Sequence, residues 1–145
     1  MVDSFSGEYR WLSNFWPVPV NYDGYVFKTV EHAYQALKCK YYNDFLEVKN
    51  CDTPGQAKRL ARQKIMRDDW EQIKTQVMFY LLQQKFSNPK MWALLVATGD
   101  QPIVEGNEWG DTFWGVCRGK GENHLGKMIM AIRAGQQRYI VQNNS

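Results

Sequence analysis

Apolar residues recur along the chain at the three- and four-residue steps that place side chains on one face of an α-helix. The clearest series is Trp70, Ile73, Val77, Leu81 and Phe86. Asp68 or Asp69, just before this series, can cap a first helical turn through its carboxylate. This stretch therefore predicts the longest helix of the chain.

A shorter apolar stripe follows Thr29, a residue type suited to a helix N-cap. The stripe consists of Val30, Ala33, Tyr34 and Leu37 and predicts a helix from 30 to about 40. Four more short helices are predicted: over 41–50, after Thr53 with Pro54 as its first residue, over 88–99 with Gly99 as its C-cap, and from 124 with Asn123 as its N-cap.

Strand patterns are fewer and shorter than helix patterns. The segments PVPV (17–20) and YVF (25–27) flank a DG turn and predict a hairpin, with Pro17 and Pro19 confining its first strand to a sheet edge. Residues 103–105 and 113–116 predict two further short strands, joined by a loop rich in glycine and acidic residues. These elements predict a mainly α fold, α+β in detail: a compact multihelical domain with an N-terminal hairpin and a small β element.

Length and composition favour one globular domain. The chain has 145 residues, of which 44% are hydrophobic and 23% charged, and it contains no internal repeat or biased linker. We therefore predict a single domain over 1–145, with its core at about 5–138 and a polar C-terminal tail.

Charge and cysteine content narrow the function classes. The net charge of +3, from 18 basic and 15 acidic residues, is too small to indicate duplex binding through many phosphates. Three cysteines, and no apolar run that would suit a signal peptide or a membrane span, favour a reduced cytoplasmic protein. Two histidines and scattered cysteines predict no metal site, and no motif predicts a cofactor.

Three polar side chains of the predicted helix at 30–40 share one stripe. Glu31, Gln35 and Lys38 are spaced i, i+4 and i+7. One interpretation is a solvated surface. The other is an acid, a hydrogen-bonding amide and an amine that point into one pocket, where a carboxylate can act as an acid or base and an amine as a nucleophile.

A loop at 105–116 combines acidic residues with indole rings. Glu105, Glu108 and Asp111 alternate with Trp109 and Trp114. Such a loop suits a flat ligand, because rings stack on it and carboxylates accept its hydrogen bonds. The alternative is a turn whose tryptophans complete the core.

Two basic segments and one amide are further candidates. The sequence RGKGENHLG (118–126) leads into a helix and suits either a phosphate or an ordinary capped turn. The basic residues at 58–67 are ambiguous in the same way and suit either a phosphate or, by default, a solvated helix face. Asn14, which lies between aromatic residues, binds either the local backbone or a ligand.

Several of these motifs together resemble one known family. WLSNFWPVPV, DG, F.TVEHAYQALK, RDDW, KF and E…D.FWGV..GKG.N.LGKMIMAIR occur in the order typical of the YbiA/NADAR family, over about 5–133. The resemblance implies a compact, mostly helical domain with a small β element. It also implies an N-glycosidase that hydrolyses the C1′–N bond between ribose and an amino group. The implied substrates are phosphoribosylamino-pyrimidine intermediates of riboflavin biosynthesis or ADP-ribosylated guanine, including guanine in nucleic acid.

The resemblance also implies residue roles. The catalytic candidates are Glu31, as the lead carboxylate, with Asp111 and Lys38. The substrate-binding candidates are Asn14, Gln35, Trp70, Trp114, Lys85, Glu105 and Asn123, of which the two tryptophans would stack on the base.

Two mechanisms and two other function classes stay open from the sequence. The carboxylates can act on an oxocarbenium-like transition state, or Lys38 can form a Schiff base with the opened sugar. A non-catalytic module that binds ADP-ribose or a nucleotide is the alternative to an enzyme. A binder of single-stranded nucleic acid, with aromatic platforms and the basic helix after Pro54, is a third possibility.

Overall fold

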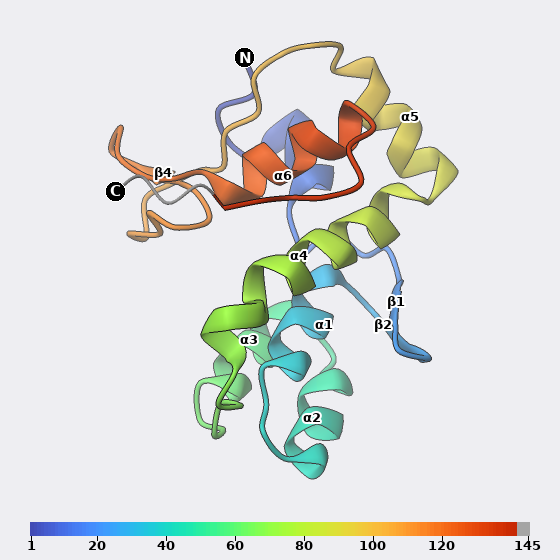
Figure 1. Cartoon of the computed structure of the whole chain (residues 1–145), viewed down its shortest axis with the longest axis vertical. Helices are drawn as coiled ribbons and strands as arrows, with labels where there is room; N and C mark the ends of the chain where they lie inside the picture. Colours follow the sequence, from blue (N-terminus) through green and yellow to red (C-terminus); the bar gives the residue numbers. More distant parts are fainter. Residues whose placement is uncertain (142–145) are drawn as a thin grey trace. The chain divides into compact units, whose positions relative to one another are not determined.

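The computed structural model describes residues 1–141, and its Cα positions group into two compact units (Figure 1). The central unit is Asn14–Lys85. The terminal unit combines Met1–Ser13 with the chain from Phe86 onward. The single domain over 1–145 stays a prediction, and residues 142–145 of the predicted polar tail lie outside the described part of the chain.

The central unit begins with the predicted hairpin. Strands β1 (Val20–Tyr22) and β2 (Tyr25–Phe27) pair in antiparallel fashion. Asp23 and Gly24 both have positive φ angles, of 50° and 83°, as the two-residue turns that fit the strand twist require. The first strand lies later than the predicted PVPV and shares only Val20 with it, because it starts directly after Pro19, which has no N–H to donate.

Three short helices follow the hairpin at the predicted places: α1 (Val30–Leu37), α2 (Tyr42–Lys49) and α3 (Pro54–Ala61). Figure 1 shows them grouped together, and α1 packs against both of the others. Thr29 caps α1 by accepting a hydrogen bond from the backbone N–H of His32 at 3.0 Å. Thr53 and Gln56 form a capping box at the start of α3.

Helix α1 ends at Leu37, earlier than the predicted end near 40. The carbonyl of Lys38 accepts a hydrogen bond from the N–H of Arg67, and the N–H of Lys40 donates to the carbonyl of Ile65. These bonds to a distant segment replace the bonds that would continue the helix. The early end is therefore a tertiary effect.

Helix α4 (Trp70–Phe86) is the longest helix, as predicted. Its buried apolar side chains are Trp70, Val77, Met78, Phe79, Leu81, Leu82 and Phe86, so its buried face is wider than one stripe. The carboxylate of Asp69, one of the two predicted caps, forms an ion pair with Arg67 at 2.6 Å.

The terminal unit contains a 3₁₀-helix that the sequence did not predict, two short strands and two helices. These are η1 (Gly7–Leu12), α5 (Pro89–Ala97), β3 (Gly106–Asn107), β4 (Val116–Cys117) and α6 (His124–Arg133). Asn88 caps α5, and Gly99 follows the end of that helix with a φ angle of 64°. The first residues of the chain join this unit through a bridge between Val2 and Ile103.

The predicted strands at 103–105 and 113–116 were placed too early. Strands β3 and β4 are two residues long each and pair in parallel, with Gly106 opposite Val116. The backbone N–H of Glu105 is not part of a ladder, because it donates to the side chain of Asn123 at 3.0 Å. Asn123 does precede α6, but in a left-handed conformation and without capping the helix through its side chain.

Within residues 1–141, no helix has both the length and the apolar character needed to cross a bilayer.

Candidate active site

Glu31 lies in the first turn of α1 and is buried, with 7% of its surface exposed. Its carboxylate accepts a hydrogen bond from Gln35 Nε2 at 2.9 Å, as the predicted i, i+4 spacing allows. The Glu31 backbone N–H donates to the carbonyl oxygen of Asn14 at 3.1 Å. The segment before the hairpin therefore holds the start of α1, and the carboxylate does not point into bulk water.

Burial raises the pKa of the Glu31 carboxyl above its usual range. The hydrogen bond from Gln35 and the positive charges of Lys58, Lys38 and Arg62 act in the opposite direction but do not cancel the effect of burial. A carboxyl group in this position retains its proton to a higher pH than a surface glutamate. It is suited to donate a proton as a general acid.

His32, the neighbour of Glu31, anchors the first turn of α1. Its Nε2 lies 2.9 Å from the carbonyl oxygen of Cys51, and its Nδ1 lies 2.8 Å from Thr29 Oγ1. Because a carbonyl oxygen only accepts, Nε2 carries the proton. Burial lowers the pKa of this ring, which favours the neutral form.

Two amide oxygens near the start of α1 have no hydrogen-bond partner among residues 1–141. Gln35 Oε1 and Asn14 Oδ1 are both buried, while Asn14 Nδ2 contacts Met78 Sδ at 3.6 Å. Buried acceptors without a partner are uncommon in folded proteins. Both oxygens are available to accept hydrogen bonds from the hydroxyl or amino groups of a ligand.

The other predicted residues of the central unit differ in exposure. Lys38 is half-buried at the C-cap of α1. Trp70 is buried, and its ring lies 5.0 Å from that of Tyr34, centroid to centroid, within the packing of α1 and α4. Lys85 is completely buried, and burial lowers its pKa to about 7.

The predicted acids of the terminal unit belong to a hydrogen-bonded loop. Asp111 Oδ1 accepts from the backbone N–H groups of Phe113, at 3.1 Å, and Trp114, at 2.9 Å. Asn107 Nδ2 donates to Glu105 Oε2 at 3.0 Å and to the carbonyl of Asp111 at 2.9 Å. Asn107 thus ties the two acidic residues together.

Asn123 and two glycines close this loop. The Asn123 amide accepts from the N–H of Glu105 and donates to the carbonyl of Ile103, both at 3.0 Å. A Cβ atom at Gly115 would overlap Glu105 Oε2, and one at Gly126 would overlap the Asn123 amide. Only residues without a side chain allow these close approaches.

The comparison with protein families identifies the chain. Residues 3–135 match the NADAR domain. The chain belongs to the NADAR family.

Two relatives of this NADAR-family chain are named as N-glycosidases. It is 37% identical to N-glycosidase YbiA of Escherichia coli strain K12 over 134 residues, which cover 90% of this chain and 83% of that protein. It is 36% identical to an N-glycosidase of Nostoc punctiforme over 132 residues, covering 86% of this chain and 84% of the relative. These relatives support an N-glycosidase role, with a small-molecule substrate, for this family member.

The chain is also similar to part of a longer protein and to a solved structure. A riboflavin biosynthesis protein of Vibrio vulnificus is 34% identical over 136 residues, which are 91% of this chain but 37% of that protein. The solution structure of E. coli YbiA matches with a TM-score of 0.80 and 35% identity, over 93% of this chain and 86% of that one. This match confirms the predicted mainly α fold with small β elements.

The structure divides the predicted site residues of this NADAR domain between the two units. Glu31, Gln35, Lys38, Asn14, Trp70 and Lys85 belong to the central unit, and Asp111, Glu105, Trp114 and Asn123 to the terminal unit. Within the first group, Glu31 and Gln35 are in direct contact. Within the second, Glu105 and Asn123 are in contact, and Trp114 is half-buried beside Phe113.

Sequence reasoning missed one residue at these places and left two others open. The charges of Lys58 and Arg62, in a basic segment that suited either a phosphate or a solvated helix face, lower the pKa of Glu31. Only the packing of α3 against α1 reveals this. Asn107 had a detectable signal, because an asparagine next to a glycine-containing loop is typical of side-chain-stabilised turns.

The described residues were also considered for a metal site and for a cavity, and only the cavity is present among them. No group of three or more histidine, cysteine or acidic residues in 1–141 is arranged to hold a metal ion. A cavity of about 440 Å³ in the terminal unit is lined by α6 and the segment 136–140, and none of the predicted site residues lines it.

Proposed function

We propose that this NADAR-family N-glycosidase hydrolyses the C1′–N bond of a ribosylamine, with Glu31 as the catalytic carboxyl group. The observation that supports this most is the burial of Glu31, which raises the pKa of its carboxyl group and favours the protonated form, although the hydrogen bond from the Gln35 amide acts against it. An exposed glutamate would not combine these features.

In the proposed reaction the Glu31 carboxyl donates its proton to the exocyclic nitrogen of the substrate. The C1′–N bond then breaks, its electron pair leaves with the amine, and positive charge develops at C1′ and the ring oxygen. The carboxylate that remains stabilises this charge, and water adds to C1′ and gives its proton to a carboxylate, which restores the acid. Asp111 is proposed as the second carboxylate of the pair that such reactions use. Hydrogen bonds from two backbone N–H groups fix its orientation.

Lys38 offers a second route to the same products. The ribosylamine opens to an imine, the Lys38 amine adds to C1′, and the amino leaving group departs as the Schiff base forms. Water then releases the sugar as its aldehyde. Borohydride separates the two routes, because reduction of a Schiff base leaves the sugar covalently attached to Lys38.

The proposed substrates follow from the family and the names of the relatives. Phosphoribosylamino-pyrimidines are the first candidate, supported by the riboflavin biosynthesis relative. ADP-ribosylated guanine, free or in nucleic acid, is the second. Asn14, Gln35, Glu105 and Asn123 are proposed to form hydrogen bonds with the substrate and Trp114 to stack on its base. Trp70, as a second stacking ring, and Lys85 are proposed as further substrate-binding residues, and both side chains are buried.

A cytoplasmic location is part of the proposal. The three cysteines Cys39, Cys51 and Cys117 are free thiols. Free thiols are typical of reducing compartments, where disulfides are rare.

The direct test is incubation with each substrate and measurement of the released sugar. We expect wild type to release it from at least one of them, and Glu31→Gln to lose most of this activity. Glu71→Gln, in the first turn of α4 and largely exposed, is the matched control and should behave as wild type. Equal, negligible release by wild type and Glu31→Gln would contradict the proposal. Stabilisation by ADP-ribose without any product would indicate a binding module instead.

A further inference from the structure

The first turn of α1, which carries Glu31, is held by two segments that are distant from it in the chain. The backbone N–H of Glu31 donates to the carbonyl oxygen of Asn14 at 3.1 Å, and Nε2 of the next residue, His32, lies 2.9 Å from the carbonyl oxygen of Cys51. His32 is almost completely buried, with 1% of its surface exposed. The proposed reaction assigns no role to this histidine.

One hydroxyl group joins the His32 ring to the backbone of the same turn. Thr29 Oγ1 accepts a hydrogen bond from the backbone N–H of His32 at 3.0 Å and lies 2.8 Å from its ring Nδ1. Because the ring Nε2 donates to the Cys51 carbonyl, Nδ1 carries no proton and accepts from the Thr29 hydroxyl. A rotation of the ring would therefore break the contact with Cys51 and disturb the N-cap of α1 at the same time.

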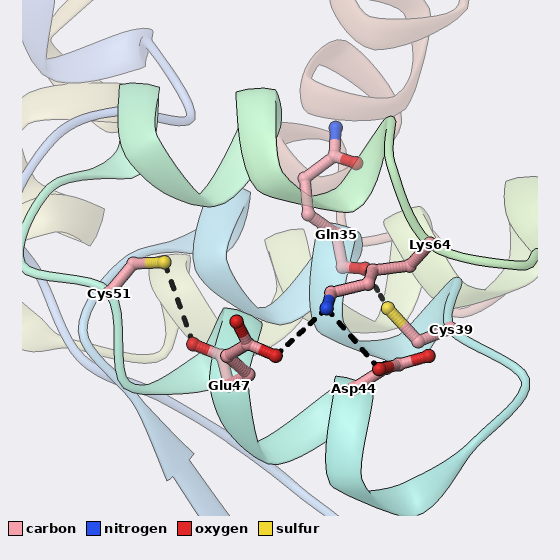
Figure 2. Close-up of polar contacts among 6 residues, drawn as sticks. All are labelled: Gln35, Cys39, Asp44, Glu47, Cys51 and Lys64. Carbon is pink, nitrogen blue, oxygen red and sulfur yellow. Dashed lines mark hydrogen bonds and ion pairs between the residues drawn. The ribbon is translucent and has the colours of Figure 1, made fainter.

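The carbonyl group of Cys51 has a defined position between α2 and α3. It also accepts a hydrogen bond from Lys28 Nζ at 2.9 Å. Figure 2 shows the thiol group of Cys51 directed at the carbonyl oxygen of Glu47 in α2, at 3.5 Å. Lys64, which follows α3, forms ion pairs with Glu47 at 2.8 Å and with Asp44 at 3.4 Å. These contacts connect α2 to the chain on both sides of α3, so His32 binds a group that is itself held in place.

We propose that His32 is a positioning residue for the Glu31 carboxyl group, and that it acts by binding the first turn of α1 to the carbonyl of Cys51. This inference rests on the proposed function and extends it to a residue that acts through Glu31. Side chains of consecutive helical residues diverge by about 100°, so the ring can hold the turn while the carboxyl group faces another direction. A misplacement of about 1 Å can cost about 10²-fold in rate, which makes this contact important for turnover.

The same contact maintains the burial of Glu31. Burial raises the pKa of the Glu31 carboxyl group. A first turn released from Cys51 would admit water to this group, and its pKa would fall towards the ordinary value of a glutamate. The pKa of Glu31 therefore reports the position of the turn without any turnover. A contact that served stability alone would leave this pKa unchanged in the folded protein.

Two substitutions separate the two hydrogen bonds of the ring. In His32→Gln the side-chain Nε2 can take the place of the ring Nε2 and donate to the Cys51 carbonyl. In His32→Asn the shorter amide can reach only the Thr29 hydroxyl. Lys28→Ala is the matched control, because it removes the other side-chain hydrogen bond to the same carbonyl from an exposed residue outside α1.

The first test is kinetic. We expect His32→Asn to lower kcat about 10- to 100-fold with KM changed less than about threefold, and His32→Gln and Lys28→Ala to stay within about threefold of wild type. The loss of kcat at high pH, where Glu31 gives up its proton, should move to lower pH in His32→Asn only. An unchanged kcat and pH profile in folded His32→Asn would overturn the inference.

The second test does not depend on turnover. A carbon-13 NMR titration of the Glu31 carboxyl group, assigned by its loss in Glu31→Gln, should give a lower pKa in His32→Asn than in wild type, His32→Gln and Lys28→Ala. This result without cleavage of any substrate would support the positioning role and contradict the N-glycosidase mechanism. Cleavage by wild type, with the same kcat and the same Glu31 titration in His32→Asn, would contradict the positioning role and leave that mechanism intact.

A variant of Thr29 covers the case in which His32→Asn does not fold. Thr29→Val removes the hydroxyl group that orients the His32 ring, and Thr29→Ser, which keeps it, is the control. We expect the Glu31 pKa to fall in Thr29→Val and to stay at the wild-type value in Thr29→Ser. The same Glu31 titration in both variants would overturn the inference.

Discussion

The central and terminal units each contain predicted catalytic acids, but they use them differently. In the central unit the Glu31 carboxyl group is buried and contacts one amide, and the charges of Lys58, Lys38 and Arg62 act on its pKa. In the terminal unit, Asp111 Oδ1 and Glu105 Oε2 accept hydrogen bonds from the loop itself. A carboxyl group is therefore buried with one side-chain hydrogen bond in the central unit, whereas the acids of the terminal unit are built into the hydrogen bonding of their loop.

This difference shows how local surroundings decide the use of a carboxylate. Backbone N–H groups and asparagine amides satisfy an acid and fix its position. Burial with few hydrogen bonds raises its pKa and prepares it for proton transfer. Asp111 belongs to the first case, since two backbone N–H groups of its loop fix its orientation, and its proposed catalytic role would use that fixed position.

The largest expected effect is on activity and separates the two acids. Glu31→Gln should lower kcat by about 10²–10⁴-fold, because the amide cannot donate the same proton. Asp111→Asn keeps an oxygen that can accept from Phe113 and Trp114, so it should fold normally but lower kcat about tenfold or more if its charge stabilises C1′. Steady-state kinetics with thermal unfolding as a fold control measures both. Unchanged kcat in Asp111→Asn would assign this acid to the loop alone.

A smaller effect on stability tests the architecture of the terminal unit. Gly115→Ala should destabilise the protein by about 3 kcal/mol, because the added methyl group overlaps the Glu105 carboxylate. Gly55→Ala in α3 is the matched control. Its Cβ would meet only Arg59 Nη1, at 3.4 Å, and it should be neutral or stabilising by about 0.5–1 kcal/mol. Denaturant unfolding measures both variants, and similar stabilities would contradict the close packing of Glu105 on Gly115.

The smallest effect concerns the pH dependence of stability in the central unit. Because the pKa of Glu31 is raised in the folded protein, the native state binds more protons than the unfolded state as pH rises above about 4.3, the ordinary pKa of a glutamate. The stabilising contribution of Glu31 is full below that pH and is lost as pH rises through the raised pKa. Glu31→Gln should lack this loss.

Denaturant unfolding of wild type and Glu31→Gln at several pH values checks this prediction. The unfolding free energy of the variant should gain on that of wild type toward higher pH, by about 1.4 kcal/mol for each unit by which the pKa is raised. A pH-independent difference between the two proteins would contradict the burial of an ionisable Glu31.

Many local elements could be predicted from the sequence because their signals are local. Asp23 and Gly24 indicated the hairpin turn, Thr29 and Thr53 the helix starts, and the apolar series from Trp70 the longest helix. The pairing of Glu31 with Gln35 followed from their i, i+4 spacing alone. In each case the interacting groups are close in sequence.

The errors arose where distant segments decide the outcome. The helix at 30–40 ended early because Arg67 and Ile65 bind its last residues. The strands near 103–117 were misplaced because Asn123, far along the chain, takes the N–H of Glu105. No local pattern contains these partners.

The sequence by itself determined the helix-rich class, the family resemblance and the acid–amide pair on α1. Only the tertiary structure decided that the carboxyl group of this pair is buried, and that Lys58 and Arg62 from another helix act on it. The physical reason is range. Helix caps and i, i+4 contacts depend on neighbours within a few residues, whereas burial and electrostatic fields depend on which distant segments pack together.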